Sequence, residues 1–192
     1  KPLYNHVRNI VLNHDDANDV LQNTFVKIFQ NLKNFKGDSK LFTWMYRIAT
    51  NEALTFLNQK ARKSGISSVE LQNKAIDNLK ADIYFEGDEI QIKLQKAIIQ
   101  LPEKQQLVFK MKYFEELKYE EISEILTTSV GALKASYHIA VKKIEEYLHT
   151  NETFNHYFCL INMKNFDIEN NEKIETGFKT PEHYFEQFEA KM

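Results

Sequence analysis

Apolar residues recur three or four positions apart through the first third of the chain, which is the spacing of one helix face. Asp15 and Asp16 supply N-cap side chains for the second of these segments, and its apolar stripe extends to Phe29 and Leu32. A break centred on Gly37 separates the second segment from the third. The pattern predicts three helices, at 1–13, about 17–33 and about 41–60.

The periodicity weakens over residues 64–88, an acidic stretch with two glycines, and this indicates a linker. Helical spacing returns at Ile90, and Pro102 stands where it suits the first turn of a new helix. A short turn at 127–129 then separates the last two helical segments. The second half of the chain is predicted to form four helices, at about 90–101, 102–113, 118–126 and 130–148.

The last two of these segments have the proportions of a helix-turn-helix. Ile122 would pack against Leu133 and Tyr137, and Ser129 or Thr128 can cap the second helix. The residues that its first turns would present to a DNA major groove are Ser129, Ala132, Lys134, Ala135, Ser136, His138 and Lys142. An ordinary helical hairpin explains the same pattern, and both interpretations stay open on these residues alone.

The stretch that starts the third helix combines aromatic and basic side chains. Phe42, Trp44 and Tyr46 can stack on unpaired bases, and Arg47 and Asn51, one turn apart, can hydrogen-bond base edges. The alternative is structural, with Trp44 in the core and Arg47 in a surface ion pair. For Trp44 alone the core position is favoured, whereas the basic face as a whole fits a nucleic-acid contact at least equally well.

Composition narrows the function classes. The chain has 192 residues with 5 Gly, 3 Pro and one Cys, which excludes a disulfide framework and a Cys-rich zinc site and fits a reducing cytoplasm. No apolar run approaches the roughly 18 residues that a membrane span needs. The 6 His show no metal-ligand spacing, and nothing supports catalysis or a cofactor.

Charge is segregated along the chain, although its net value is only −2. Residues 1–63 carry ten basic and five acidic side chains, 64–88 carry two and five, and 151–192 carry four and eight, while 89–150 balance. A basic first block fits a polyanion-binding protein. An excess of five charges is modest, so charge by itself gives weak support for nucleic-acid binding.

Three motifs together resemble bacterial RNA polymerase sigma factors of the extracytoplasmic-function group of the sigma-70 family. They are DANDVLQNTFVKIFQNL at 16–32, the aromatic stretch at 35–54, and LPEKQQLVFKMKYFEELKYEEISEIL at 101–126. The resemblance covers about residues 1–149. It implies an all-α fold of two small helical domains joined by a flexible acidic linker, the second domain being a helix-turn-helix. The expected parts are a region 2-like domain that lacks its beginning (1–63), the linker (64–88) and a region 4-like domain (89–150).

The resemblance implies a sigma subunit that binds core RNA polymerase, recognises promoter DNA and assists strand opening. The residues on the family's contact positions for the β′ clamp helices are Asp19, Gln22, Asn23 and Phe25. Trp44, Arg47 and Asn51 lie on its minus-ten positions, and the same predicted site includes Lys40, Phe42 and Tyr46. The helix-turn-helix face would contact the minus-thirty-five element. The polymerase β flap and an anti-sigma factor are further implied partners, with no cofactor, metal or membrane insertion.

The chain departs from the family pattern in both domains. Asn23 stands where an acidic residue is usual, and Thr127 stands where the turn between the two helices usually has Gly. Because a β-branched residue resists positive φ, we expect a different turn geometry. Ser136, Ile139 and Val141 stand where the family tends to have Arg, which predicts few phosphate contacts at the minus-thirty-five element.

Residues 151–192 lie outside the resemblance. They are interpreted either as a disordered acidic appendage or as the start of a downstream reading frame at Met163, and residues 163–192 are expected to be dispensable for transcription. Two other functions stay open for the whole chain. One is a stand-alone helix-turn-helix transcriptional regulator, and the other is a protein-interaction module without promoter activity.

Overall fold

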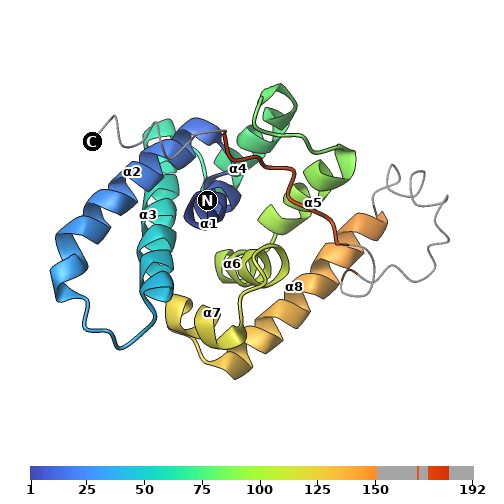
Figure 1. Cartoon of the computed structure of the whole chain (residues 1–192). Coiled ribbons are helices and arrows are strands. Elements are labelled where there is room, and N and C mark those ends of the chain that lie inside the picture. The colour runs from blue at the N-terminus through green and yellow to red at the C-terminus, as the bar shows by residue number, and fades with distance from the viewer. Residues whose placement is uncertain (151–167, 169–172, 182–192) are drawn as a thin grey trace.

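Helices form most of the computed structural model, which describes residues 1–150, 168 and 173–181 (Figure 1). The α-helices are α1 (Pro2–Val11), α2 (His14–Asn31), α3 (Leu41–Ser64), α4 (Ser68–Asp77), α5 (Glu89–Ile99), α6 (Glu103–Phe109), α7 (Tyr119–Leu126) and α8 (Val130–Thr150). Two short 3-10 turns, η1 (Leu32–Asn34) and η2 (Leu79–Ala81), and a π-helical segment, η3 (Lys110–Phe114), complete them. Within the described residues the only extended pairing is an isolated bridge between Phe85 and Phe178. The predicted all-α fold is confirmed.

Local side-chain chemistry sets the ends of the first helices. α2 is capped by Asn13, whose side chain accepts a hydrogen bond from the Asp16 N–H at 3.0 Å. The predicted caps Asp15 and Asp16 therefore lie inside the first turn, where their carboxylates favour the positive end of the helix dipole. α3 ends at Gly65, which has a φ of 65° that a residue with a Cβ rarely adopts.

The first domain consists of α1, α2 and α3. α1 packs against both longer helices, and Tyr4, Val7 and Val11 are at most 1% exposed. Apolar burial continues on α2 at Val20 and Leu21. A ten-residue helix is buried along almost its whole length because the second domain covers the side that α2 and α3 leave open (Figure 1).

The second domain consists of α5 to α8, and the linker is folded between the domains. Instead of a flexible tether, the linker forms α4 and η2, and it buries Ile76 and Leu79 with Leu12 of the first domain and Ile99 of the second. One continuous apolar cluster also runs through both domains, with α3 packed against α7. The two domains are thus closed on each other in this structure.

The described part of the tail also packs on the domains. Residues 173–181 run across the molecule as an extended segment, and Ile168 and Ile174 are buried. The interpretation as a disordered appendage is therefore wrong for these residues. The remainder of the predicted tail, at 151–167, 169–172 and 182–192, lies outside the described residues.

Candidate nucleic-acid and protein interfaces

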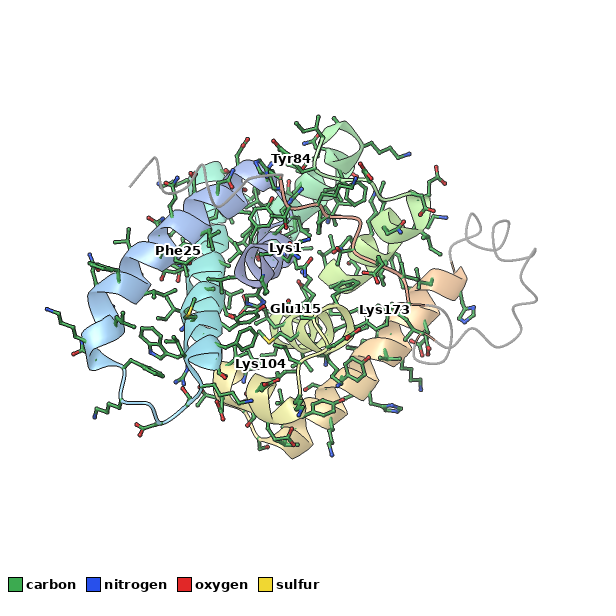
Figure 2. The ribbon with its side chains drawn as sticks, in the orientation of Figure 1. Lys1, Phe25, Tyr84, Lys104, Glu115 and Lys173 are labelled. Atoms are coloured by element: carbon green, nitrogen blue, oxygen red, sulfur yellow. The ribbon has the colours of Figure 1, made fainter. Side chains whose placement is uncertain are left out.

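The outer face of α2 presents the predicted polymerase contacts to solvent. Asp19, Gln22 and Asn23 are exposed, and Phe25 is half-buried (Figure 2). The buried stripe of this helix runs through Val20, Leu21, Thr24 and Ile28 instead. The four predicted residues therefore lie on or beside a surface that the fold does not need for its own core.

Three apolar side chains on α2 and its C-terminal end extend this surface. Val26, Phe29 and Leu32, three positions apart, are 48%, 81% and 47% exposed. Phe29 and Leu32 belong to the predicted apolar stripe of this helix and yet are exposed, because helical spacing identifies a face without saying what covers it. Neighbouring exposed apolar residues of this kind mark protein-interaction surfaces. A signal of this surface is present in the sequence, since α2 has more apolar positions than one buried stripe can hold.

A shallow pocket separates the end of α2 from α3. Trp44 is half-buried against Phe35, with 5.2 Å between ring centroids, and it lines the pocket with Ile48 and Asn51. The pocket has a volume of about 340 Å³. This lies at the small end of the ligand-pocket range of about 300–1,000 Å³. An aromatic wall beside an amide can stack a single base and hydrogen-bond its edge. The structure thus brings two of the predicted minus-ten residues together.

Arg47 lies one turn from Asn51 on the same helix. Its side chain is half-buried, and its Nε has no hydrogen-bond partner among the described residues. A buried guanidinium N–H without an acceptor is costly, and a phosphate or base acceptor relieves that cost. The alternative prediction of a surface ion pair finds no support, because no such pair is found for Arg47 within the described part of the chain.

The other three predicted minus-ten residues face the second domain. Lys40 is exposed, but its Nζ lies 3.2 Å from a carboxylate oxygen of Glu121 on α7. Phe42 packs on Tyr46 at 4.2 Å between centroids, and Tyr46 is only 3% exposed. Burial, aided by the charge of Glu115, raises the pKa of Tyr46. The predicted base-stacking role of Tyr46 is therefore not available in the closed arrangement, where its ring belongs to the core.

The second domain contains the predicted helix-turn-helix. Ile122 of α7 and Leu133 and Tyr137 of α8 are buried together, and Ser129 accepts a hydrogen bond from the Ala132 N–H at 3.4 Å. Thr127 adopts φ 51° and ψ 49°. The expectation of a different turn geometry is wrong, because Thr127 takes the left-handed conformation that Gly would take.

Six of the predicted recognition residues belong to α8, and Ser129 directly precedes it. Six of the seven are exposed, and Ser136 is half-buried; the exposed ones are Ser129, Ala132, Lys134, Ala135, His138 and Lys142. The face is built mainly from small side chains and two lysines. It can enter a major groove closely but offers few cationic groups to phosphates.

Polar groups occupy the boundary between the domains. His6 Nδ1 lies 3.0 Å from the carboxylate of Glu115, and His6 Nε2 lies 2.8 Å from the Thr50 hydroxyl. Lys110 is 2% exposed, and the burial of its ammonium lowers its pKa to about 7 against the attraction of Glu115. The sequence analysis missed this network, because isolated polar residues on a helix give no periodic signal.

Metal-ligand groups and membrane-spanning helices were searched for in the described part of the chain. No group of three or more His, Cys, Asp or Glu side chains there is arranged to hold a metal ion. Among the helices searched, none is both long and apolar enough to cross a bilayer.

Comparison with known proteins identifies the two domains. Residues 1–63 match the family model "Sigma-70 region 2", and residues 91–144 match "Sigma-70, region 4". The chain is 33% identical over 145 residues to the RNA polymerase sigma-H factor of Pseudomonas aeruginosa, covering 70% of this chain and 75% of the relative. It is 31% identical over 130 residues to the ECF RNA polymerase sigma-E factor of Escherichia coli K12, covering 62% and 67%.

A solved structure supports the same fold. The sigma factor RpoE of Bartonella quintana, crystallised with the anti-sigma factor NepR, superposes with a TM-score of 0.58 at 19% identity, covering 78% of this chain and 91% of that one. The family matches account for both domains, and the curated relatives span both of them in one alignment. The chain belongs to the sigma-70 family of RNA polymerase sigma factors, in its extracytoplasmic-function group.

Proposed function

We propose that this sigma factor binds core RNA polymerase through the outer face of α2 and captures one melted promoter strand in the pocket beside Trp44. The observation that supports this most strongly is the pocket itself, in which Trp44 and Asn51 lie between α2 and α3 with Arg47 one turn away. The apolar strip of Val26 and Phe29 lies on the neighbouring helix. Polymerase docking and strand capture thus use adjacent surfaces of one domain.

Strand opening by this surface needs no catalytic group. A surface that binds the single strand better than the duplex shifts the melting equilibrium toward the open form. Stacking contributes about 1–3 kcal/mol per base, so one or two captured bases together with phosphate contacts offset local unpairing. We accordingly propose that the chain has no enzymatic activity of its own.

The exposed face of α8 is proposed to contact the minus-thirty-five element. Ala132 and Ala135 allow the helix backbone to approach base edges closely, and Lys134 and Lys142 contact phosphates. Because the cationic groups are few, this contact contributes orientation more than affinity.

The partners proposed for this chain are core polymerase, promoter DNA and an anti-sigma factor. The β′ clamp helices would take the α2 face, and the β flap would take the second domain. The anti-sigma proposal is supported by the fold shared with a sigma factor that was crystallised with one. Because it would act on core RNA polymerase, we propose that the chain works in the cytoplasm.

Run-off transcription with purified core polymerase over a promoter library tests the proposal. We expect promoter-specific transcripts only when the protein is present, and tight binding to polymerase with poor binding to free duplex. A stand-alone helix-turn-helix regulator would instead bind duplex without polymerase. An interaction module would give no promoter-specific transcript, and that result would overturn the proposal.

A further inference from the structure

The extended segment 173–181 touches the second domain, the linker and the first domain in turn. In Figure 1 it crosses the face of the molecule from the side of α8 toward α1, and Figure 2 places Lys173 and Tyr84 toward its two ends. The segment lies outside both family matches, the second of which ends at residue 144. Its contacts therefore call for a separate explanation.

The first contacts of the segment are with the second domain. The Ile174 N–H donates to the Tyr113 hydroxyl at 2.9 Å, and the Ile174 side chain is 8% exposed. Lys173 Nζ lies 2.6 Å from the carboxylate of Glu116. Before the segment in the chain, the Ile168 N–H donates to the side chain of Glu145 on α8 at 3.0 Å.

The middle of the segment adds a short antiparallel pairing to the linker. The Glu86 N–H donates to the Gly177 carbonyl, and the Lys179 N–H donates to the Tyr84 carbonyl, both at 2.9 Å. Gly177 has a φ of 76°, and a Cβ there would meet the Phe85 ring at 2.7 Å and the Gly87 Cα at 2.8 Å. Only glycine fits this position, so the pairing depends on it.

The end of the segment reaches the first domain. The Arg8 guanidinium lies 4.3 Å from the centroid of the Phe178 ring, whose other neighbour is Phe85 at 5.6 Å. Arg8 is itself buried and paired with Asp82 of the linker. Beyond it, the Thr180 hydroxyl donates to the Asn5 side chain at 2.8 Å. One aromatic side chain thus connects the linker to α1.

The domain boundary that the segment spans contains polar groups that favour separation of the two domains. His6 and Lys110 are buried between the domains and Glu115 is half-buried beside them, so parting of the domains would return each group to water. A buried lysine opposes closure, so contacts elsewhere must supply part of the stability of the closed form. The segment 173–181 supplies such contacts on both domains at once.

Closure also restricts what a sigma factor can do. Promoter elements centred near −10 and −35 are about 25 base pairs, or about 85 Å, apart along B-DNA. A compact body of about 150 residues is only about 40 Å across. The closed form cannot reach both elements at once, and it keeps Tyr46 buried and Lys40 paired with Glu121.

We propose that Arg8, Tyr84, Phe85 and Tyr113 line a peptide groove across the two domains, that its occupant is this chain's own segment 173–181, and that occupancy holds the sigma factor closed and inactive. The claim that the closed form is inactive rests on the proposed sigma function, whereas the claim that the segment holds the domains together does not. The expectation that residues 163–192 are dispensable for transcription stays a prediction, and the proposal adds that their removal would raise activity.

The test uses full-length chains with single substitutions. Gly177→Val blocks the pairing by its Cβ, and Tyr113→Phe removes only the hydroxyl that accepts the Ile174 N–H. Glu175→Gln, at an exposed position of the same segment, is the matched control. Domain separation is followed with fluorophores attached at Arg62→Cys and Lys142→Cys in a Cys159→Ser background. Small-angle scattering gives the radius of gyration, and circular dichroism gives the helix content.

We expect Gly177→Val to raise the ratio of open to closed protein about tenfold, which corresponds to about 1.4 kcal/mol. Tyr113→Phe should raise this ratio less, and the Glu175→Gln control should leave it unchanged. Transcription by the unlabelled variants should rise in the same order. Domain opening without any transcription from wild type or variant would support the groove and overturn the sigma function. Unchanged domain separation in Gly177→Val, with unchanged helix content, would overturn the groove.

Discussion

The pocket beside Trp44 in the first domain and the exposed surface of α8 in the second domain differ in chemistry. The first has an aromatic ring and an amide that line a pocket of about 340 Å³, and one helical turn away the Arg47 Nε has no hydrogen-bond partner among the described residues. The second is a convex helix surface of small residues with Lys134 and Lys142. A pocket favours unpaired bases, whereas a smooth helix favours an intact major groove. We therefore propose that strand opening belongs to the first domain and duplex positioning to the second.

Promoter binding by both surfaces should require that the protein is bound to core polymerase. The largest effect is therefore expected from substitutions on the α2 surface that lower polymerase affinity. Gln22→Lys with Asn23→Lys should lower the affinity for core polymerase at least about 100-fold, because misplaced charge at an interface costs several kcal/mol. Both residues are exposed, so the helical spectrum should not change. Asn58→Lys with Gln59→Lys, an exposed amide pair on α3, is the control. Equal polymerase affinity in the two double variants would refute the docking face.

Within the first domain, Trp44→Ala should weaken binding of the polymerase complex to single-stranded minus-ten oligonucleotide about tenfold or more. The reason is the loss of a stacking contact worth about 1–3 kcal/mol. Phe56→Ala removes another half-buried aromatic of α3 outside the pocket and controls for packing. Equal losses in both variants would show that Trp44 acts only through the fold.

The two faces are held together by a pH-dependent boundary. Lys110 has a pKa of about 7 in the closed form, below its ordinary value of 10.5, because burial disfavours its charged form. The open form binds more protons between these values, so closure should strengthen as pH rises from about 7 toward 10. Domain separation followed from pH 6.5 to 9 should show this trend, and Lys110→Met should remove its lysine-dependent part. An identical pH profile in the variant would contradict the assignment.

The smallest effect is expected on α8. Lys134→Ala with Lys142→Ala should reduce holoenzyme binding to duplex minus-thirty-five DNA by less than tenfold and lower the salt dependence by about two phosphate contacts. Lys104→Ala, on α6, controls for net charge (Figure 2). Titration at several salt concentrations measures both quantities. A slope equal to that of wild type would remove these lysines from the interface.

Much of the architecture could be predicted from the sequence, because apolar spacing is a local property. The helix pair of α7 and α8 and its contact between Ile122 and Leu133 follow that spacing directly. Apolar spacing identifies one face of a helix but not the element that packs against that face. This is why Phe29, predicted on the apolar stripe of its helix, is exposed, and why Tyr46, predicted to stack on bases, is buried.

The closed arrangement could not be predicted, because its determinants give no periodic signal. His6 and Glu115 are 109 residues apart in the chain, and each is an ordinary polar residue in its own helix or turn. Gly177 and Phe178 stand in a stretch whose acidic composition indicates only a tail. Contacts of this kind depend on the tertiary arrangement.

Permanganate footprinting of promoter thymines tests the central claim most directly, because it detects unpaired bases in the minus-ten element. With core polymerase and wild-type protein, we predict reactive thymines on duplex promoter DNA. With Asn51→Ala, polymerase binding should persist while that reactivity falls, and Gln59→Ala, also exposed on α3, should behave as wild type. Full reactivity with Asn51→Ala and Trp44→Ala alike would contradict strand capture in the pocket.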